Sequence, residues 1–141
     1  MSMKYFSTNR KSLHIDFREA TIKGLAPDKG LYFPETIPQV DKELLANIES
    51  IGNEEIAFRV IQPYVGTEIK EEELYHIVSE TVNFSIPLVI INERISSLEL
   101  FHGPTLAFKD VGARFMSRCL AQFVKGADRK VTVLVATSGD T

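Results

Sequence analysis

The 141-residue sequence contains a single cysteine, Cys119, and no tryptophan. One thiol excludes an internal disulfide framework and a cysteine-rich zinc site, and it suits a reducing compartment, so we expect a cytoplasmic protein. Long hydrophobic runs are also missing, because stretches such as 88–91 and 133–136 fall far short of the ~18 residues that a membrane span needs. The N-terminus lacks the apolar segment of a secretory signal. We therefore expect no membrane partner.

A strong excess of charge of either sign is missing as well. The chain has 16 Lys and Arg against 19 Asp and Glu, a net charge of −3. This balance does not favour binding to nucleic acid. The 44% hydrophobic and 25% charged residues are typical of a globular protein that buries a core. The acidic run 71–73 reads as a solvated first turn of a helix, and we expect no metal site.

The pattern of residues 1–83 predicts a mainly helical unit with short strands. Asp16 and Glu19 have the spacing of a capping box, and the short helix that follows is expected to end at Gly24. The segment 24–34 alternates turn residues with an aromatic pair and predicts turns around a short strand. Acidic or capping residues followed by apolar stripes predict three further helices. These helices are expected to begin at Asp41, Asn53 and Glu71.

The pattern changes near residue 84, where we place a domain boundary. Strand-like segments at 88–91 and 98–101 precede a long apolar helix over 106–124, and 130–136 is apolar on both faces like a buried parallel strand. A strand, a helix and a strand predict a βαβ unit, so the fold class is α/β. A helix should follow the last strand, and because the sequence stops there the chain is expected to be truncated.

Two segments contain residues that suit catalysis or ligand binding. In FHGPTLAFKD, residues 101–110, Thr105 is the expected N-cap and Lys109 lies near the positive end of the helix. That position and the apolar neighbours favour the neutral amine that attacks aldehydes, while Asp110 acts in the opposite direction. The alternative is a surface lysine paired with Asp110.

The second segment, ATSGDT at 136–141, follows the expected strand. Its short hydroxyl side chains and glycine suit a turn that holds a carboxylate or a phosphate on backbone N–H groups. Ligands of open α/β sheets bind at this end of a strand. The alternative is an ordinary turn and N-cap, which these residue types also favour.

Together these segments, in this order and about 30 residues apart, resemble the threonine synthases, a family of pyridoxal phosphate enzymes related to tryptophan synthase β. STNR at 7–10 looks like the family's STR start, and GLAPDKGLYFP at 24–34 resembles its GL…GLF.P segment. STNR differs from that start by the inserted Asn9, which puts any role of Arg10 in question.

The resemblance implies a fold type II enzyme in which residues 1–83 form the helical N-terminal domain and 84–141 begin the cofactor domain. Lys109 would hold pyridoxal 5'-phosphate as a Schiff base and then move protons on the substrate, O-phosphohomoserine. Phosphate would leave, and water would add to give threonine. Asp140 would lie near the cofactor ring. The family's substrate-carboxylate loop corresponds to Thr137, Ser138, Gly139, Asp140 and Thr141.

Other interpretations stay open. The family's cofactor-phosphate loop and most substrate-phosphate ligands would lie beyond residue 141, so these 141 residues alone are expected to be inactive. The parent could instead be a serine or threonine dehydratase relative, or a non-catalytic module with a vestigial lysine. His102 could face the cofactor or be structural. Cys119 is expected to be a buried small hydrophobe.

Overall fold

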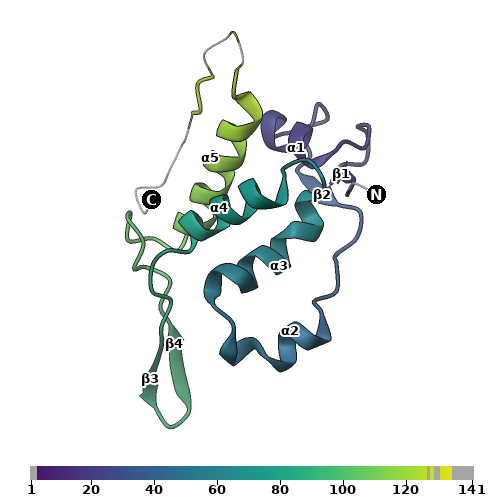
Figure 1. Cartoon of the computed structure of the whole chain (residues 1–141). Coiled ribbons are helices and arrows are strands. Elements are labelled where there is room, and N and C mark those ends of the chain that lie inside the picture. The colour runs from purple at the N-terminus through teal and green to yellow at the C-terminus, as the bar shows by residue number, and fades with distance from the viewer. Residues whose placement is uncertain (1–2, 127, 129–130, 135–141) are drawn as a thin grey trace.

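The computed structural model describes residues 3–126, 128 and 131–134. It is a mixed α/β structure, as the sequence predicts, in which five α-helices are combined with two small antiparallel sheets. Three helices, α3 (Asn53–Val65), α4 (Glu71–Thr81) and α5 (Asp110–Val124), form the centre of the molecule (Figure 1). No helix in the described part of the chain has the length and apolar character needed to cross a membrane.

The N-terminal sheet joins the two N-terminal motifs. Strand β1 (Tyr5–Ser7) pairs antiparallel with β2 (Tyr32–Pro34), with Phe6 opposite Phe33. The Asp28 carboxylate accepts hydrogen bonds from the Ser7 hydroxyl at 2.6 Å, the Lys11 N–H at 2.9 Å and the Gly30 N–H at 3.0 Å. A Cβ on Gly30 would lie 2.1 Å from Ser7 Oγ, so only glycine fits there. STNR and GLAPDKGLYFP therefore form one structural unit.

The helices largely begin where the sequence predicts. Helix α1 (Phe17–Lys23) is capped by Asp16, whose carboxylate accepts the Glu19 N–H at 2.8 Å, and it ends at Gly24 with φ +65°. Helix α4 begins at Glu71, as expected. Asn53 is the first residue of α3 and not its cap, because Gly52 occupies the N-cap position. The helix expected from Asp41 divides into α2 (Lys42–Ala46) and a 3-10 turn, Ile48–Ser50.

The hydrophobic core lies where α3, α4 and α5 meet. Leu74 and Val65 are completely buried, and Cys119 and Phe123 bring α5 into the same cluster. Burial raises the pKa of the Cys119 thiol to about 12, in agreement with its predicted role as a small hydrophobe. From the N-terminal side, the Phe17 ring of α1 packs against Phe123 with ring centroids 5.9 Å apart.

Helix α5 is also tied to α4 by two arginines. Arg118 Nε donates to the Glu80 carboxylate at 2.6 Å, and Arg114 donates to the Glu80 carbonyl and, at 2.9 Å, to Asn83 Oδ1. The positive charges hold the pKa of the Glu80 carboxyl below its usual value, with the Arg118 hydrogen bond as the main cause. The sequence does not reveal these cross-helix contacts, because it does not show which helices lie side by side. The helix that follows Lys109 is thus fixed along its length.

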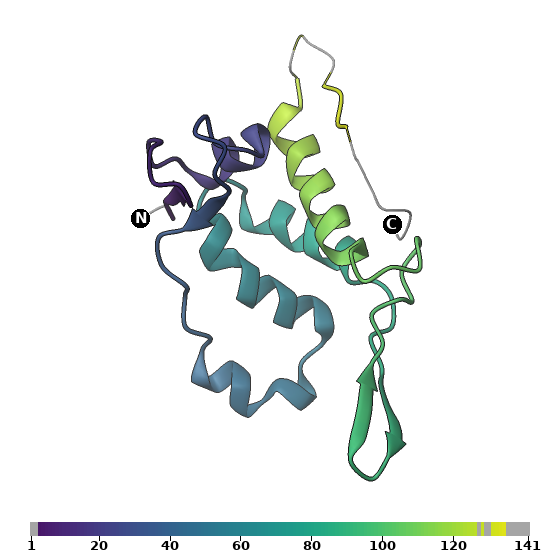
Figure 2. The same cartoon turned by 180° about the vertical axis from the view of Figure 1, so that it is seen from behind.

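The strands after residue 84 form a hairpin. Strand β3 (Leu88–Asn92) pairs antiparallel with β4 (Ile95–Leu98), and the Asn92 side chain closes the turn by accepting the Arg94 N–H at 2.9 Å. The second strand was expected at 98–101, several residues later. Both views show the hairpin projecting away from the helices (Figures 1 and 2).

The strand expected over 130–136 is not formed in the part that is described. Residues 131–134 have no strand assignment, and within the described residues β3 and β4 pair only with each other. The expected βαβ unit is therefore not seen there. Residues apolar on both faces are typical of a buried strand, but a strand also needs hydrogen-bonding partners, which this pattern does not supply.

Candidate active site

The candidate lysine lies in a turn between the hairpin and α5. Helix α5 begins at Asp110, not at residue 106, and Lys109 occupies its N-cap position with φ −71° and ψ −11°. Thr105 is therefore not the N-cap that the sequence predicted. Residues 104–109 form successive turns, with the Asp110 N–H bonded to the Ala107 carbonyl at 3.1 Å. The lysine is placed closer to the helix start than the sequence indicated.

Asp110 explains why Thr105 does not cap the helix. The Thr105 N–H donates to Asp110 Oδ2 at 3.0 Å, and the Thr105 hydroxyl donates to Oδ1 at 2.9 Å. Asp110 is almost completely buried, and as the first residue of α5 its carboxylate lies at the favourable end of the helix dipole. Both carboxylate oxygens are thus bonded to Thr105. The role of these two residues was missed, although their five-residue separation in the sequence was visible.

The surroundings of Lys109 combine an amine with aromatic and apolar groups. The Lys109 ammonium lies 5.6 Å from the centroid of the Phe108 ring, and the residue is half-buried. Phe108 also lines a hollow of about 500 Å³ together with Leu98, Leu100, Phe101, Leu106 and Ala107. A primary amine is the nucleophile that an aldehyde cofactor requires. The described residues therefore fit pyridoxal phosphate at its aldehyde.

His102 lies on the same connection but is engaged elsewhere. Its Nε2 forms a 2.7 Å hydrogen bond with Glu99 Oε2, and its ring stacks on Phe101 with centroids 4.7 Å apart. These two contacts give the histidine a structural role in the connection before the lysine. That His102 also faces a cofactor stays a prediction.

The second predicted segment cannot be placed against the lysine. Thr137, Ser138, Gly139, Asp140 and Thr141 lie outside the described residues. Their expected roles stay predictions. The described residues contain no cluster of His, Cys, Asp and Glu that could hold a metal ion.

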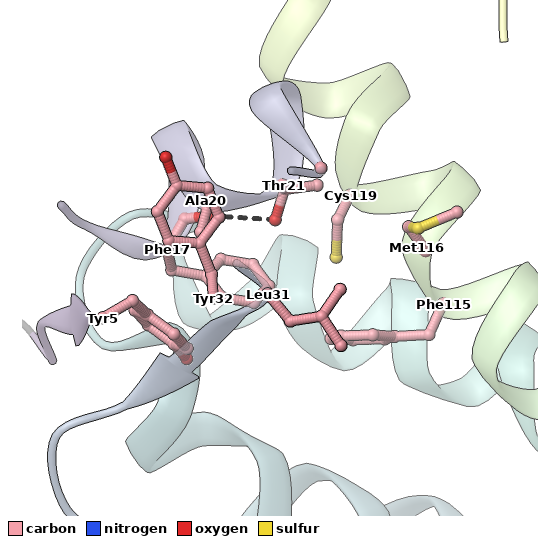
Figure 3. Close-up of a pocket in the computed structure, with 10 residues that line it drawn as sticks. Tyr5, Phe17, Ala20, Thr21, Leu31, Tyr32, Phe115, Met116 and Cys119 are labelled. Atoms are coloured by element: carbon pink, nitrogen blue, oxygen red, sulfur yellow. Dashed lines mark hydrogen bonds between the residues drawn. The ribbon is translucent and has the colours of Figure 1, made fainter. Parts of the chain in front are cut away.

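A separate apolar pocket lies between α5 and the N-terminal unit. It has a volume of about 340 Å³ and is lined by Tyr5, Phe17, Tyr32, Phe115 and Cys119, among others (Figure 3). Burial raises the pKa of the Tyr5 hydroxyl to about 12, and this hydroxyl donates to the Tyr64 carbonyl at 2.8 Å. Because its lining consists mostly of apolar and aromatic side chains from α1, α5 and the N-terminal sheet, we assign this pocket to packing.

Comparison with known proteins agrees with these features. The profile of the family described as threonine synthase N terminus matches residues 4–82. The chain is 36% identical over 140 residues to a threonine synthase of Buchnera aphidicola and 39% identical over 139 residues to that of Haemophilus influenzae. Each match covers 99% of this chain, but only 33% and 32% of the relative. The chain thus spans about a third of the length of these relatives.

Solved structures give the same result. A pyridoxal-phosphate-bound threonine synthase from Brucella melitensis superposes with a TM-score of 0.82 at 36% identity, over 88% of this chain and 28% of that one. The yeast threonine synthase gives a TM-score of 0.77 at 38% identity, over 88% and 27%. The fold is that of the N-terminal part of these enzymes. The chain belongs to the threonine synthase N-terminus family.

Proposed function

We propose that this chain is the N-terminal portion of a threonine synthase, a carbon–oxygen lyase that acts on a phosphate ester. The complete protein would convert O-phospho-L-homoserine and water to L-threonine and phosphate. The observation that carries the proposal is Lys109 at the start of α5, next to Phe108, in a chain that matches threonine synthases over 99% of its length.

Lys109 is the proposed catalytic residue and cofactor ligand. Pyridoxal phosphate, when bound, supplies an electron sink for the substrate carbons. The Lys109 amine would hold the cofactor through its aldehyde, and as a free amine it would move protons at the substrate α and β carbons. In this structure Lys109 is half-buried, and its ammonium lies 5.6 Å from the centroid of the Phe108 ring.

The remaining site residues are proposed from the family resemblance. Thr137, Ser138, Gly139, Asp140 and Thr141 would bind the substrate carboxylate, with Asp140 close to the cofactor ring. The proposal also divides the chain into a helical domain, 1–83, and the beginning of the cofactor domain, 84–141. Because the chain spans about a third of its relatives, we expect these 141 residues alone to be inactive. The single cysteine is the reason to expect that the complete protein acts in the cytoplasm.

A chemical label tests the proposal directly. The complete polypeptide is incubated with pyridoxal phosphate, reduced with borohydride and mapped by peptide mass spectrometry. A pyridoxyl group on Lys109 is expected, and its absence would support a non-catalytic module with a vestigial lysine. A parallel assay compares phosphate release from O-phosphohomoserine with ketoacid formation from threonine. Ketoacid formation without phosphate release would contradict the proposed reaction and indicate a dehydratase.

A further inference from the structure

The turn that carries Lys109 is closed by a single buried side chain. Asp110 is 4% exposed, and its two carboxylate oxygens accept the Thr105 N–H at 3.0 Å and the Thr105 hydroxyl at 2.9 Å. A buried carboxylate is tolerated when such donors satisfy its oxygens. These two bonds join residues 105 and 110 into a closed ring that includes Lys109.

The backbone around this ring is shaped to admit the carboxylate. A Cβ on Gly103 would lie 2.4 Å from Asp110 Oδ2, so the carboxylate packs directly on the glycine backbone. Leu106 has φ +58°, a left-handed conformation that is unfavourable for a residue with a branched side chain. Strained backbone of this kind persists where surrounding contacts hold it in place. The Asp110 hydrogen bonds are such contacts.

We propose that Thr105 and Asp110 are positioning residues for Lys109. The inference rests on the proposed role of Lys109 as the cofactor lysine. Lys109 lies inside the closed ring, one residue before Asp110, so the two hydrogen bonds fix the position of its Cα and the direction in which its side chain leaves the backbone. Covalent attack on an aldehyde depends on such placement of the amine. Neither Thr105 nor Asp110 needs to touch the substrate.

Two substitutions at one position separate this role from general packing. Thr105→Val keeps the shape of the side chain and the backbone N–H bond but removes the hydroxyl donor, whereas Thr105→Ser retains the hydroxyl. Both are made in the complete polypeptide, and circular dichroism checks that they fold. The first readout is the rate at which Lys109 acquires a borohydride-reducible label from pyridoxal phosphate. Labelling of Lys125, exposed beyond the opposite end of α5, is the internal control.

The expected result is a roughly tenfold slower labelling of Lys109 in Thr105→Val, because a misplaced amine reaches the aldehyde less often. We expect Thr105→Ser to restore a rate within about twofold of the unsubstituted protein, and Lys125 labelling to be the same in all three. In steady-state assays Thr105→Val should lower kcat more than it raises KM.

Different results overturn different statements. Unchanged Lys109 labelling in Thr105→Val, or equally slow labelling in the valine and serine variants, would overturn the positioning role of the hydroxyl while leaving the proposed function intact. No label on Lys109 in the unsubstituted protein would overturn the proposed function, and this inference with it. If Thr105→Val does not fold, hydrogen exchange of the Thr105 amide in Asp110→Ala decides, because alanine removes both acceptor oxygens. Exchange as slow as in the unsubstituted protein would overturn the inference, and faster exchange with slower Lys109 labelling would support it.

Discussion

At the scale of single residues, Asp28 forms the joint between the two N-terminal motifs, STNR at 7–10 and GLAPDKGLYFP at 24–34. Its carboxylate accepts hydrogen bonds from Ser7, Lys11 and Gly30, which belong to segments about 20 residues apart. The Ser7 hydroxyl is the largest cause that lowers the pKa of Asp28 to about 2. The sequence predicted that the two motifs matter, but not that they meet, because a turn motif does not specify its distant partner.

The lowered pKa of Asp28 predicts that acid weakens the contacts of this joint. The folded state favours the carboxylate, so Asp28 stabilises the fold above its unfolded pKa of about 3.9, and this contribution is lost as the pH falls from about 4 to about 2. We expect Asp28→Asn to lower the urea midpoint of unfolding at pH 6. The difference from the unsubstituted chain should shrink toward pH 2.

A matched control is Glu49→Gln, which removes a carboxylate from the exposed 3-10 turn. Its urea midpoint should stay close to that of the unsubstituted chain at every pH. An equal loss in both variants, or a loss in Asp28→Asn that does not depend on pH, would contradict the proposed joint.

At the scale of elements, the sequence predicted helices better than their ends. Helices α1 and α4 begin where predicted, because their first turns contain a local cap or a run of acids that the sequence displays. Helix α5 begins four residues later than expected, since the Thr105 hydroxyl bonds to the buried Asp110 carboxylate and not to a backbone N–H of the first helical turn. This contact depends on three-dimensional burial of Asp110, which periodicity does not reveal.

The packing of the helices gives a prediction of stability. Leu74 of α4 is 0% exposed in the core between α3 and α5, whereas Leu13 is 86% exposed. Leu74→Ala removes buried methyl groups and leaves a cavity, so we expect it to lower the free energy of unfolding by about 2–5 kcal/mol. The same substitution at Leu13 should change it by less than about 0.5 kcal/mol. Chemical denaturation measures both, and similar losses would contradict the assigned core.

At the scale of the whole molecule, the β3–β4 hairpin projects from the helices and is little covered by the rest of the described residues. Leu88 and Ile90 are 65% and 76% exposed, and they alternate with Val89 and Ile91, which are also exposed. Successive side chains of a strand point to opposite faces, so both faces of the hairpin are apolar and open to solvent. Such a surface, with unpaired strand edges, favours association with another chain.

We therefore expect the 141-residue chain by itself to self-associate through this hairpin. Ile90→Lys should weaken the association roughly ten- to a hundredfold, since it removes an isoleucine that the contact between chains would bury and places a charge there. Ile37→Lys, at a position 68% exposed outside the hairpin, is the control. Sedimentation equilibrium measures the association, and equal effects of both variants, or a monomeric unsubstituted chain, would show that the hairpin is not the contact.

From the sequence, it was the order of motifs along the chain that indicated the function. It indicated the family that the profile and the solved structures then identified. Motif order did not reveal the ring between Thr105 and Asp110, because its donors and acceptors are ordinary residues until the fold buries them. It also did not show that 131–134 lie outside any strand, because strand pairing depends on other segments.

Replacing Lys109 with alanine in the complete polypeptide tests the proposed function most directly. With O-phosphohomoserine and pyridoxal phosphate supplied, we expect Lys109→Ala to lower the rate of threonine formation by about a thousandfold or more, while Lys125→Ala stays close to the unsubstituted protein. Circular dichroism should show that both variants are folded. Threonine formation by folded Lys109→Ala at the unsubstituted rate would contradict the assignment of this amine to catalysis.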